Sequence, residues 1–158
     1  VIGSVYCITE DEAANLGILL EETWELLSLW RYDAEEYGRA VANKPGATWS
    51  KLNNVDTTPA TNATTKDKEA ALYSMTHTEF ITLYNRWHAQ LGTTFIGGLK
   101  SSEYMHTRIS LVLLTRIVSH FPTKSKLGEK FGAVLKPLQS DENPMQDIKT
   151  MAQGYESQ

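Results

Sequence analysis

The sequence predicts an all-α protein of about five helices, stacked as antiparallel hairpins in an α-solenoid-like arrangement. Apolar residues recur at spacings of three and four through most of its 158 residues, which is the pattern of helices with a buried side. Two capping-box motifs mark helix starts. No segment sustains the period-two alternation of a half-buried strand. One long, disordered-looking loop is expected to interrupt the helices.

The first helix is expected to begin at a capping box, Thr-Glu-Asp-Glu at residues 9–12. The Thr9 hydroxyl can accept a hydrogen bond from an orphan helical N–H, and Glu12 can reach back. The apolar stripe that follows comprises Leu16, Leu20, Trp24, Leu27, Trp30, Ala34, Tyr37 and Val41. Further apolar residues widen it, namely Ile18, Leu19, Leu26 and Leu29. Because one neighbouring helix cannot cover so wide a stripe, partners are expected on two sides.

Residues 43–75 are predicted to form a loop or insertion. Pro45 cannot continue a helical hydrogen-bond ladder, and Gly46 accepts a left-handed turn. The following stretch is rich in Thr, Asn and Ala and poor in apolar residues, so residues 53–66 are expected to be its most mobile part. Apart from this loop, residues 1–158 are interpreted as a single fragment of a larger helical scaffold.

Four further helices are predicted after the loop. A second capping box at residues 76–79 opens the next helix, whose glycines indicate close packing or an early end. Ser101 or Ser102 can cap the stretch 103–122, which closes at Phe121-Pro122. An apolar stripe from Leu127 to Leu138 forms a fourth helix. The last is expected to start with Asn143 as cap and Pro144 at its first position.

The apolar stripes also predict the core. Large residues at these spacings bury most area when they face a neighbouring helix. The single cysteine, Cys7, is expected to be buried, because free cysteine is among the most buried residue types. The predicted structural core consists of Trp24, Leu27, Trp30, Tyr84, Trp87, Leu91, Leu113, Ile117 and Phe121.

The net charge of −4 conceals an asymmetry along the chain. Residues 76–138 carry eight basic and three acidic side chains, whereas residues 1–45 carry three basic and nine acidic ones. A locally basic half is typical of a solvated helix surface, and also of a surface that binds an acidic partner or a nucleic acid. Candidate partner or RNA contacts are Arg108, Arg116, Lys124, Lys126, Lys130 and Lys136. A direct RNA-binding helical module using this basic half therefore remains an alternative function.

The sequence contains no motif for catalysis, metal binding or a cofactor, so a non-enzymatic protein is predicted. None of the four histidines, at 77, 88, 106 and 120, has another at i,i+4, and no HExxH or glycine-rich phosphate loop occurs. A hydrolase based on His88 or His106 would lack a nucleophile and an orienting group. The longest apolar run, Leu111 to Leu114, is far below the ~20 residues of a membrane span.

A series of short motifs in a fixed order resembles the THO complex subunit 2 family, whose members are the largest subunits of the THO/TREX transcription-export complex. Both ends of the chain take part, since the opening VIGSVYCITEDEAANLG is similar to the family's pattern as well. The later motifs are Trp87-His88, Glu103-Tyr104 with His106 and Arg108, Leu113-Leu114-Thr115 with Arg116, Phe121-Pro122, and Met151-Ala152-x-Gly154-Tyr155.

This resemblance implies a fragment from the C-terminal half of the family's helical scaffold region, in a nuclear protein that is not an enzyme. Such a scaffold would couple transcription to mRNA packaging and export. Its implied partners are other THO subunits, especially the second-largest, and a DEAD-box RNA helicase, with mRNA bound indirectly or weakly. No cofactor and no membrane are implied. The Thr/Asn-rich insertion fits a fungal source.

The chain departs from the family pattern in two segments. The Thr/Asn-rich insertion is longer and less apolar than the corresponding connection, and residues 122–135 replace a more charged helix. Family contacts made through these two segments are therefore not carried over to this chain.

Overall fold

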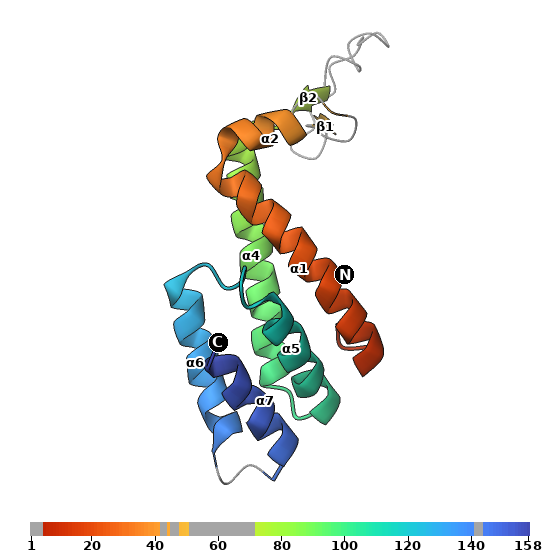
Figure 1. The fold of residues 1–158 in the computed structure, drawn as a ribbon, viewed down its shortest axis with the longest axis vertical. Coiled ribbons are helices and arrows are strands. Elements are labelled where there is room, and N and C mark those ends of the chain that lie inside the picture. The colour runs from red at the N-terminus through yellow and green to blue at the C-terminus, as the bar shows by residue number, and fades with distance from the viewer. Residues whose placement is uncertain (1–4, 42–43, 45–47, 51–71, 141–143) are drawn as a thin grey trace, which may run out of the picture. The chain divides into compact units, whose positions relative to one another are not determined.

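The computed structural model describes residues 5–41, 44, 48–50, 72–140 and 144–158. It confirms the all-α class, with antiparallel helical hairpins that follow one another along the chain (Figure 1). The described residues form six helices, α1 (Glu10–Tyr32), α2 (Ala34–Ala40), α4 (His77–Leu99), α5 (Tyr104–Ile117), α6 (Ser125–Gln139) and α7 (Gln146–Glu156). The predicted mobile stretch 53–66 lies outside the described residues.

The chain divides into two compact units, which are described separately. One comprises Val1–Ser28 with Asn85–Gln158, and the other comprises Leu29–Tyr84. Helices α1 and α4 each contribute residues to both units. The first unit also contains α5, α6 and α7, and the second contains α2 and the two short strands.

Both predicted capping boxes are present. The backbone N–H of Thr9 donates to the Glu12 carboxylate at 2.8 Å, and the N–H of Glu12 donates to the Thr9 hydroxyl at 3.3 Å. Thr76 and Glu79 repeat this reciprocal pair at 2.9 and 3.3 Å. Because each box satisfies two orphan backbone donors, the helices begin at the next residues, Glu10 and His77.

The first helix ends earlier than the apolar stripe predicts. A single helix through to Val41 is wrong, because Asp33 adopts an extended backbone (φ −116°, ψ 102°) and caps a separate helix, α2. Its carboxylate accepts hydrogen bonds from the N–H groups of Glu35 and Glu36, both at 2.9 Å. Asp is among the strongest N-cap residues, so this side chain starts a new helix at a position that periodicity treats as continuous.

Two three-residue strands lie within the segment predicted as a loop. β1 (Thr48–Ser50) pairs antiparallel with β2 (Leu72–Ser74), with Trp49 opposite Tyr73. A strand of three residues is too short to show an alternating pattern in the sequence, which explains why this pair was not predicted. The pair leaves the all-α class unchanged.

The unit Leu29–Tyr84 is built around the Phe80 ring. Tyr37 of α2 stacks on it with ring centroids 5.0 Å apart, and Trp30 of α1 meets it nearly edge-on at 6.1 Å. Two polar contacts complete the cluster. The Tyr37 hydroxyl donates to the carbonyl of Met75 at 2.8 Å, and the His77 ring is hydrogen-bonded to the carbonyl of Trp30 at 2.8 Å.

In the other unit, α4, α5, α6 and α7 run alternately up and down in Figure 1. Helix α7 packs against both α5 and α6. The turn before α5 is closed by Ser101, whose hydroxyl accepts from the N–H of Glu103 at 3.1 Å. Helix α7 begins at Gln146, after the expected Pro144 start, and the proposed cap Asn143 lies outside the described residues.

Helix α4 continues through its glycines to Leu99, and two of them let other helices approach closely. A Cβ on Gly98 would lie 2.0 Å from the Ser110 hydroxyl oxygen of α5, and one on Gly92 would lie 2.7 Å from a methyl carbon of Leu127 in α6. Real Cβ atoms do not approach that closely, so the glycines set the spacing of the hairpins. The sequence predicted that these glycines indicate either close helix packing or an early end of the helix. The structure shows close packing, and the helix does not end early.

The core of this unit centres on Phe121, which follows α5. Its ring lies 4.7 Å from that of His88, 5.7 Å from Trp24 and 6.0 Å from both Phe95 and Phe131. These rings come from α1, α4 and α6, so one side chain in a turn joins three helices. Aromatic pairs at such separations add about 0.5–1.5 kcal/mol each beyond their area burial.

Most of the predicted core residues are buried. The structure buries Trp24, Tyr84, Leu91, Leu113, Ile117 and Phe121, and it leaves Leu27 and Trp30 half-buried. The prediction that Trp87 belongs to the core is wrong. Its side chain is 38% exposed, whereas the adjacent His88 is 1% exposed. Both positions lie at helical spacing from Leu91, and the imidazole is the ring that fills the space beside Trp24 and Phe121. Cys7 is exposed as well, in the turn before α1.

Candidate functional site

Arg108 on α5 is a charged side chain with ion-pair partners on two other helices. Its guanidinium binds the Glu10 carboxylate of α1 with two hydrogen bonds, at 2.8 and 2.9 Å. The same guanidinium donates to Asp147 of α7 at 2.6 Å and to the Tyr104 hydroxyl at 3.0 Å. Arg108 therefore joins three helices through four oxygen contacts, two of them in the bidentate geometry that suits a planar guanidinium.

The ionisable groups of this cluster influence one another's pKa. The hydrogen bonds from Arg108 lower the pKa of the Glu10 carboxyl, and the same interaction raises the pKa of Arg108. The pKa of Asp147 is lowered, first by the hydrogen bond from the Tyr104 hydroxyl and then by backbone N–H groups and Arg108. That bond to Asp147 raises the pKa of Tyr104. All these shifts favour the charge states that hold the helices together.

Replacing Arg108 with methionine is expected to lower the melting temperature by roughly 2–4 °C at neutral pH. The pKa values of Glu10 and Asp147 are lowered on folding, so their contribution is complete above the unfolded values of about 4. It is lost as pH falls through the lower folded values. The difference in melting temperature between wild type and variant should therefore narrow below about pH 4, as measured by thermal melts across a pH series.

Arg39→Met serves as the control, because its ion pair with Glu36 leaves Arg39 79% exposed. A difference that does not depend on pH would contradict this role of the cluster.

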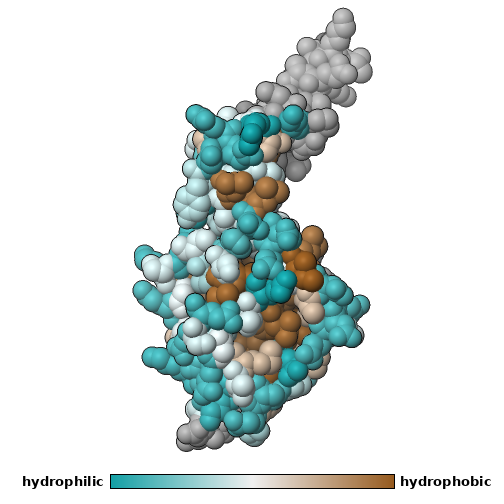
Figure 2. All heavy atoms as spheres, in the orientation of Figure 1, coloured by the Kyte–Doolittle hydropathy of each residue, from teal (hydrophilic) through white to brown (hydrophobic). Residues whose placement is uncertain are grey.

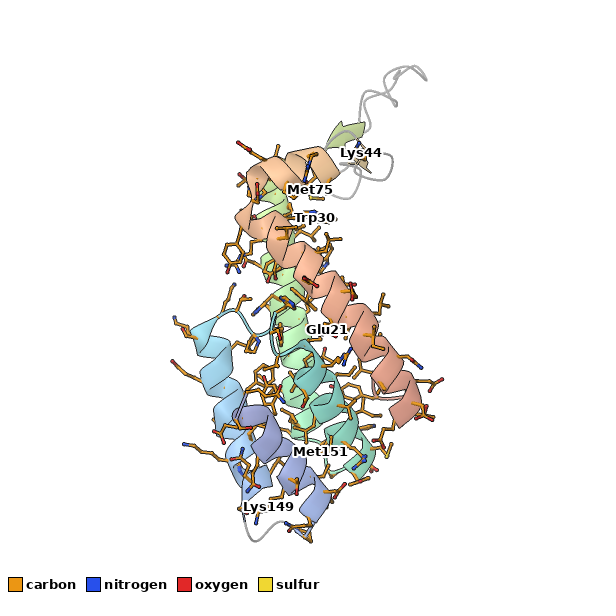
Figure 3. All side chains as sticks on the ribbon, viewed as in Figure 1. Glu21, Trp30, Lys44, Met75, Lys149 and Met151 are labelled. Carbon is orange, nitrogen blue, oxygen red and sulfur yellow. The ribbon has the colours of Figure 1, made fainter. Side chains whose placement is uncertain are left out.

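Arg116 makes a second cross-link between α5 and α1. Its Nε lies 2.7 Å from the Glu21 carboxylate. Gly17 allows this approach, because a Cβ there would lie only 3.1 Å from the Arg116 side chain. Figure 3 shows Glu21 on the side of α1 that faces α5, and Met151, whose sulfur lies 3.8 Å from Arg108, on α7. Both arginines proposed as partner contacts are thus engaged by carboxylates of the same chain.

The lysines proposed as partner contacts are arranged differently. Lys124, Lys126 and Lys130 line a shallow hollow of 210 Å³ beside α4, and Lys136 lies nearer the end of α6. Among the described residues, none of these four lysines has a carboxylate within ion-pair distance. The remaining lining residues of the hollow are His88, Ala89, Thr93, Ile96 and Leu127. The structure thus brings three of the six candidates together and leaves both arginines apart from them.

His88, which is one of the residues that line this hollow, has a packing role. Its Nε2 accepts a hydrogen bond from the backbone N–H of Thr123 at 3.1 Å. An accepting Nε2 requires the neutral imidazole, and the ring is buried between Trp24 and Phe121. His106 is hydrogen-bonded through Nδ1 to the Ser101 hydroxyl at 2.9 Å. Both rings therefore hold turns of the hairpins in place.

A second, larger hollow of 390 Å³ lies where α5, α6 and α7 meet. Its lining is made of hydroxyl-bearing and apolar side chains, including Ser101, Thr107 and Met145. Across the described ranges, no three His, Cys, Asp or Glu side chains gather as a metal site would require. Within the same ranges, no helix has both the length and the apolar composition of a membrane span.

Sequence reasoning identified Arg108 but not its partners. Glu10 lies 98 residues away from it and Asp147 lies 39 residues away. The only local signal was an arginine at the edge of an apolar stripe, which cannot name a carboxylate on another helix. The pairing depends on how α1 and α7 cross α5, and that packing became visible only in the structure.

Stacked antiparallel hairpins, linked by ion pairs and by glycine contacts, place this chain in the class of α-solenoid-like helical proteins. The family model Tho2, described as "Transcription factor/nuclear export subunit protein 2", matches residues 1–158. The chain therefore belongs to the Tho2 family, as the resemblance in its motifs predicts.

Curated relatives agree with this assignment. The chain is 26% identical over 151 residues to THO complex subunit 2 of Arabidopsis thaliana, which covers 95% of this chain and 7% of the relative. It is 26% identical over 159 residues to THO complex subunit 2 of Homo sapiens, covering 100% of this chain and 9% of the relative. The chain thus spans less than a tenth of the length of these relatives. No solved structure matches it.

Proposed function

We propose that this chain is part of a non-enzymatic scaffold subunit of a nuclear THO complex, which couples transcription to mRNA packaging and export. The observation that carries the proposal is the match of the Tho2 family model to all 158 residues. The names of the relatives, THO complex subunit 2 in a plant and in mammals, support membership of such a complex. The proposed partners are other THO subunits, especially the second-largest, and a DEAD-box RNA helicase.

Two structural features fit a protein that acts through surface contacts. The polar cluster around Arg108 joins α1, α5 and α7 to one another. Several large apolar side chains are nevertheless exposed, among them Ile18, Leu19 and Leu26, which are 45–59% exposed on α1. Apolar groups gathered on a surface are typical of protein contact sites.

The proposal predicts co-purification with THO subunits. The chain, tagged within its natural polypeptide, should recover other THO subunits and a DEAD-box helicase from nuclear extract, as identified by mass spectrometry. An untagged strain gives the background. Recovery of other nuclear proteins without any THO subunit would contradict the assignment.

Nuclease treatment in the same experiment separates the proposal from the RNA-binding alternative. The grouping of Lys124, Lys126 and Lys130 around one hollow is the observation that favours direct RNA contact. Partners held by protein contacts should remain after RNase digestion. If every partner is lost, RNA bridges them, and the basic surface is the better account of how this chain acts.

A further inference from the structure

The exposed side of α1 combines apolar and acidic side chains in an ordered way. Ile18, Glu22 and Leu26 follow one another at intervals of four residues, so they form one row along the helix. Leu19 and Glu25 flank this row. Ile18 is 47% exposed, Leu19 59% and Leu26 45%, and both glutamates are exposed. These five residues are called the α1 outer face below.

Four of the acidic residues of α1 form two pairs that differ in their partners. Glu10 and Glu21 point toward α5, where Arg108 and Arg116 neutralise them. On the outer face, Glu22 and Glu25 make no ion pair with any described residue. The first 21 residues of α1, up to Trp30, contain no basic side chain. The outer face is therefore acidic as well as apolar.

A purely apolar neighbour would not suit this face. Glu22 lies between Ile18 and Leu26, so any helix that covers the two apolar side chains also removes the carboxylate from water. Burying a carboxylate without a partner is costly, whereas a hydrogen-bonded cation opposite it compensates. The occupant therefore needs apolar side chains on one stripe and lysine or arginine beside that stripe.

We infer that the α1 outer face docks a basic amphipathic helix of a partner protein. Helix-on-helix docking buries side chains at intervals of three and four, which is the spacing of Ile18, Leu19, Glu22 and Leu26. The mixed composition also indicates the source of the helix. Interfaces between separately folded proteins are about as apolar as ordinary surface, whereas a permanently buried face has few charges. Figure 2 shows apolar patches alternating with hydrophilic side chains along α1.

This inference deepens the proposed scaffold function and rests on it. A direct test uses the full chain and a designed helical peptide of about 20 residues, long enough to form a helix. The peptide has leucines at every third and fourth position and lysines on both flanks of that stripe. In a second peptide each lysine is replaced by glutamate. Binding is followed by fluorescence anisotropy of the labelled peptides.

The lysine peptide is expected to bind, and the glutamate peptide is expected not to bind. The double variant Leu19→Gln/Leu26→Gln should weaken binding at least about tenfold, because it removes the apolar contacts. The double variant Glu22→Lys/Glu25→Lys should reverse the preference, so that the glutamate peptide binds. Met105→Gln is the matched control, since Met105 is a 42% exposed apolar residue on a different helix. All these side chains are exposed, so circular dichroism and melting should match the wild type.

Several results would overturn the inference. Equal binding of both peptides would show that charge is not recognised, and binding of neither would show that no helix docks there. An equal loss with Met105→Gln would place the contact elsewhere. Self-association of the chain that the leucine variant abolishes, measured by sedimentation, would make a second copy the occupant. If THO subunits still co-purify with the chain in any of these cases, the docking inference is wrong but the proposed scaffold function is not contradicted.

Discussion

Replacing Leu113 with aspartate is expected to unfold the unit that contains α5. The Leu113 side chain is fully buried, and one of its methyl groups lies 3.7 Å from the position of a Cβ on Gly17 in α1. The change removes apolar contacts, which for a buried leucine costs about 2–5 kcal/mol, and it also buries a carboxylate with no partner. Because a domain of this size is stable by about 5–15 kcal/mol, the two losses together remove most of that margin. Far-UV circular dichroism should show lost helicity and no cooperative melting transition.

The matched control for this variant lies on the same helix. Met105→Asp introduces the same charge two turns earlier in α5, where the native side chain is 42% exposed. A surface substitution of this kind changes stability by about 0.5 kcal/mol or less, so this variant should melt like the wild type. Cooperative melting of Leu113→Asp near the wild-type temperature would contradict the packing of α5 between α1 and the later hairpin.

The helices after the loop could be predicted because their signals are local. Thr76 and Glu79 are three residues apart, and their reciprocal hydrogen bonds form within one turn. Apolar residues at spacings of three and four then mark each buried side. Such local information also supported the family resemblance, which the match of the Tho2 model confirms.

The features that could not be predicted from the sequence are positions where two local structures were equally compatible with the apolar pattern. Asp33 lies within a continuous apolar pattern, and periodicity alone gave no reason to prefer its capping role over a solvated helical position. Trp87 and His88 are adjacent on α4, and either could have been the residue that faces the core. The larger apolar area of the tryptophan side chain favoured Trp87 in the prediction. The Trp24 and Phe121 rings, together with the N–H of Thr123, select the imidazole instead.

The basic residues proposed as partner or RNA contacts also could not be told apart from the sequence. Arg108 and the lysines of α6 have the same sign and lie in the same basic half of the chain. Their roles differ because carboxylates of α1 and α7 reach Arg108, whereas no described carboxylate pairs with Lys124, Lys126 or Lys130. Net charge along a sequence cannot separate paired from unpaired groups, since pairing is a property of the packed helices.

Gly98→Ala is expected to destabilise the protein, although alanine is the better helix former by about 1 kcal/mol. The new Cβ would lie 2.0 Å from the Ser110 hydroxyl oxygen, 3.2 Å from the Ser110 Cβ and 3.2 Å from the Tyr6 ring. Rotating the hydroxyl away would relieve only the first contact and would break its hydrogen bond to the His106 carbonyl, which is 2.7 Å long. Overpacking of this kind typically costs about 1–3 kcal/mol, so the clash outweighs the gain in helix propensity. Urea denaturation should show a lower midpoint with an unchanged slope.

Two further variants separate this close approach from a general effect of glycine. Gly128→Ala should stabilise the protein by up to about 1 kcal/mol, because a Cβ at Gly128 in α6 meets nothing within 4 Å. The double variant Gly98→Ala/Ser110→Gly adds a side chain on α4 and removes the one that it would meet on α5. It should recover part of the stability lost in Gly98→Ala. A double-mutant cycle would then give a favourable coupling energy between the two positions. If Gly98→Ala stabilises the protein as Gly128→Ala does, then α4 and α5 do not cross at these two residues. If the cycle is additive, the loss in Gly98→Ala does not arise from contact with Ser110.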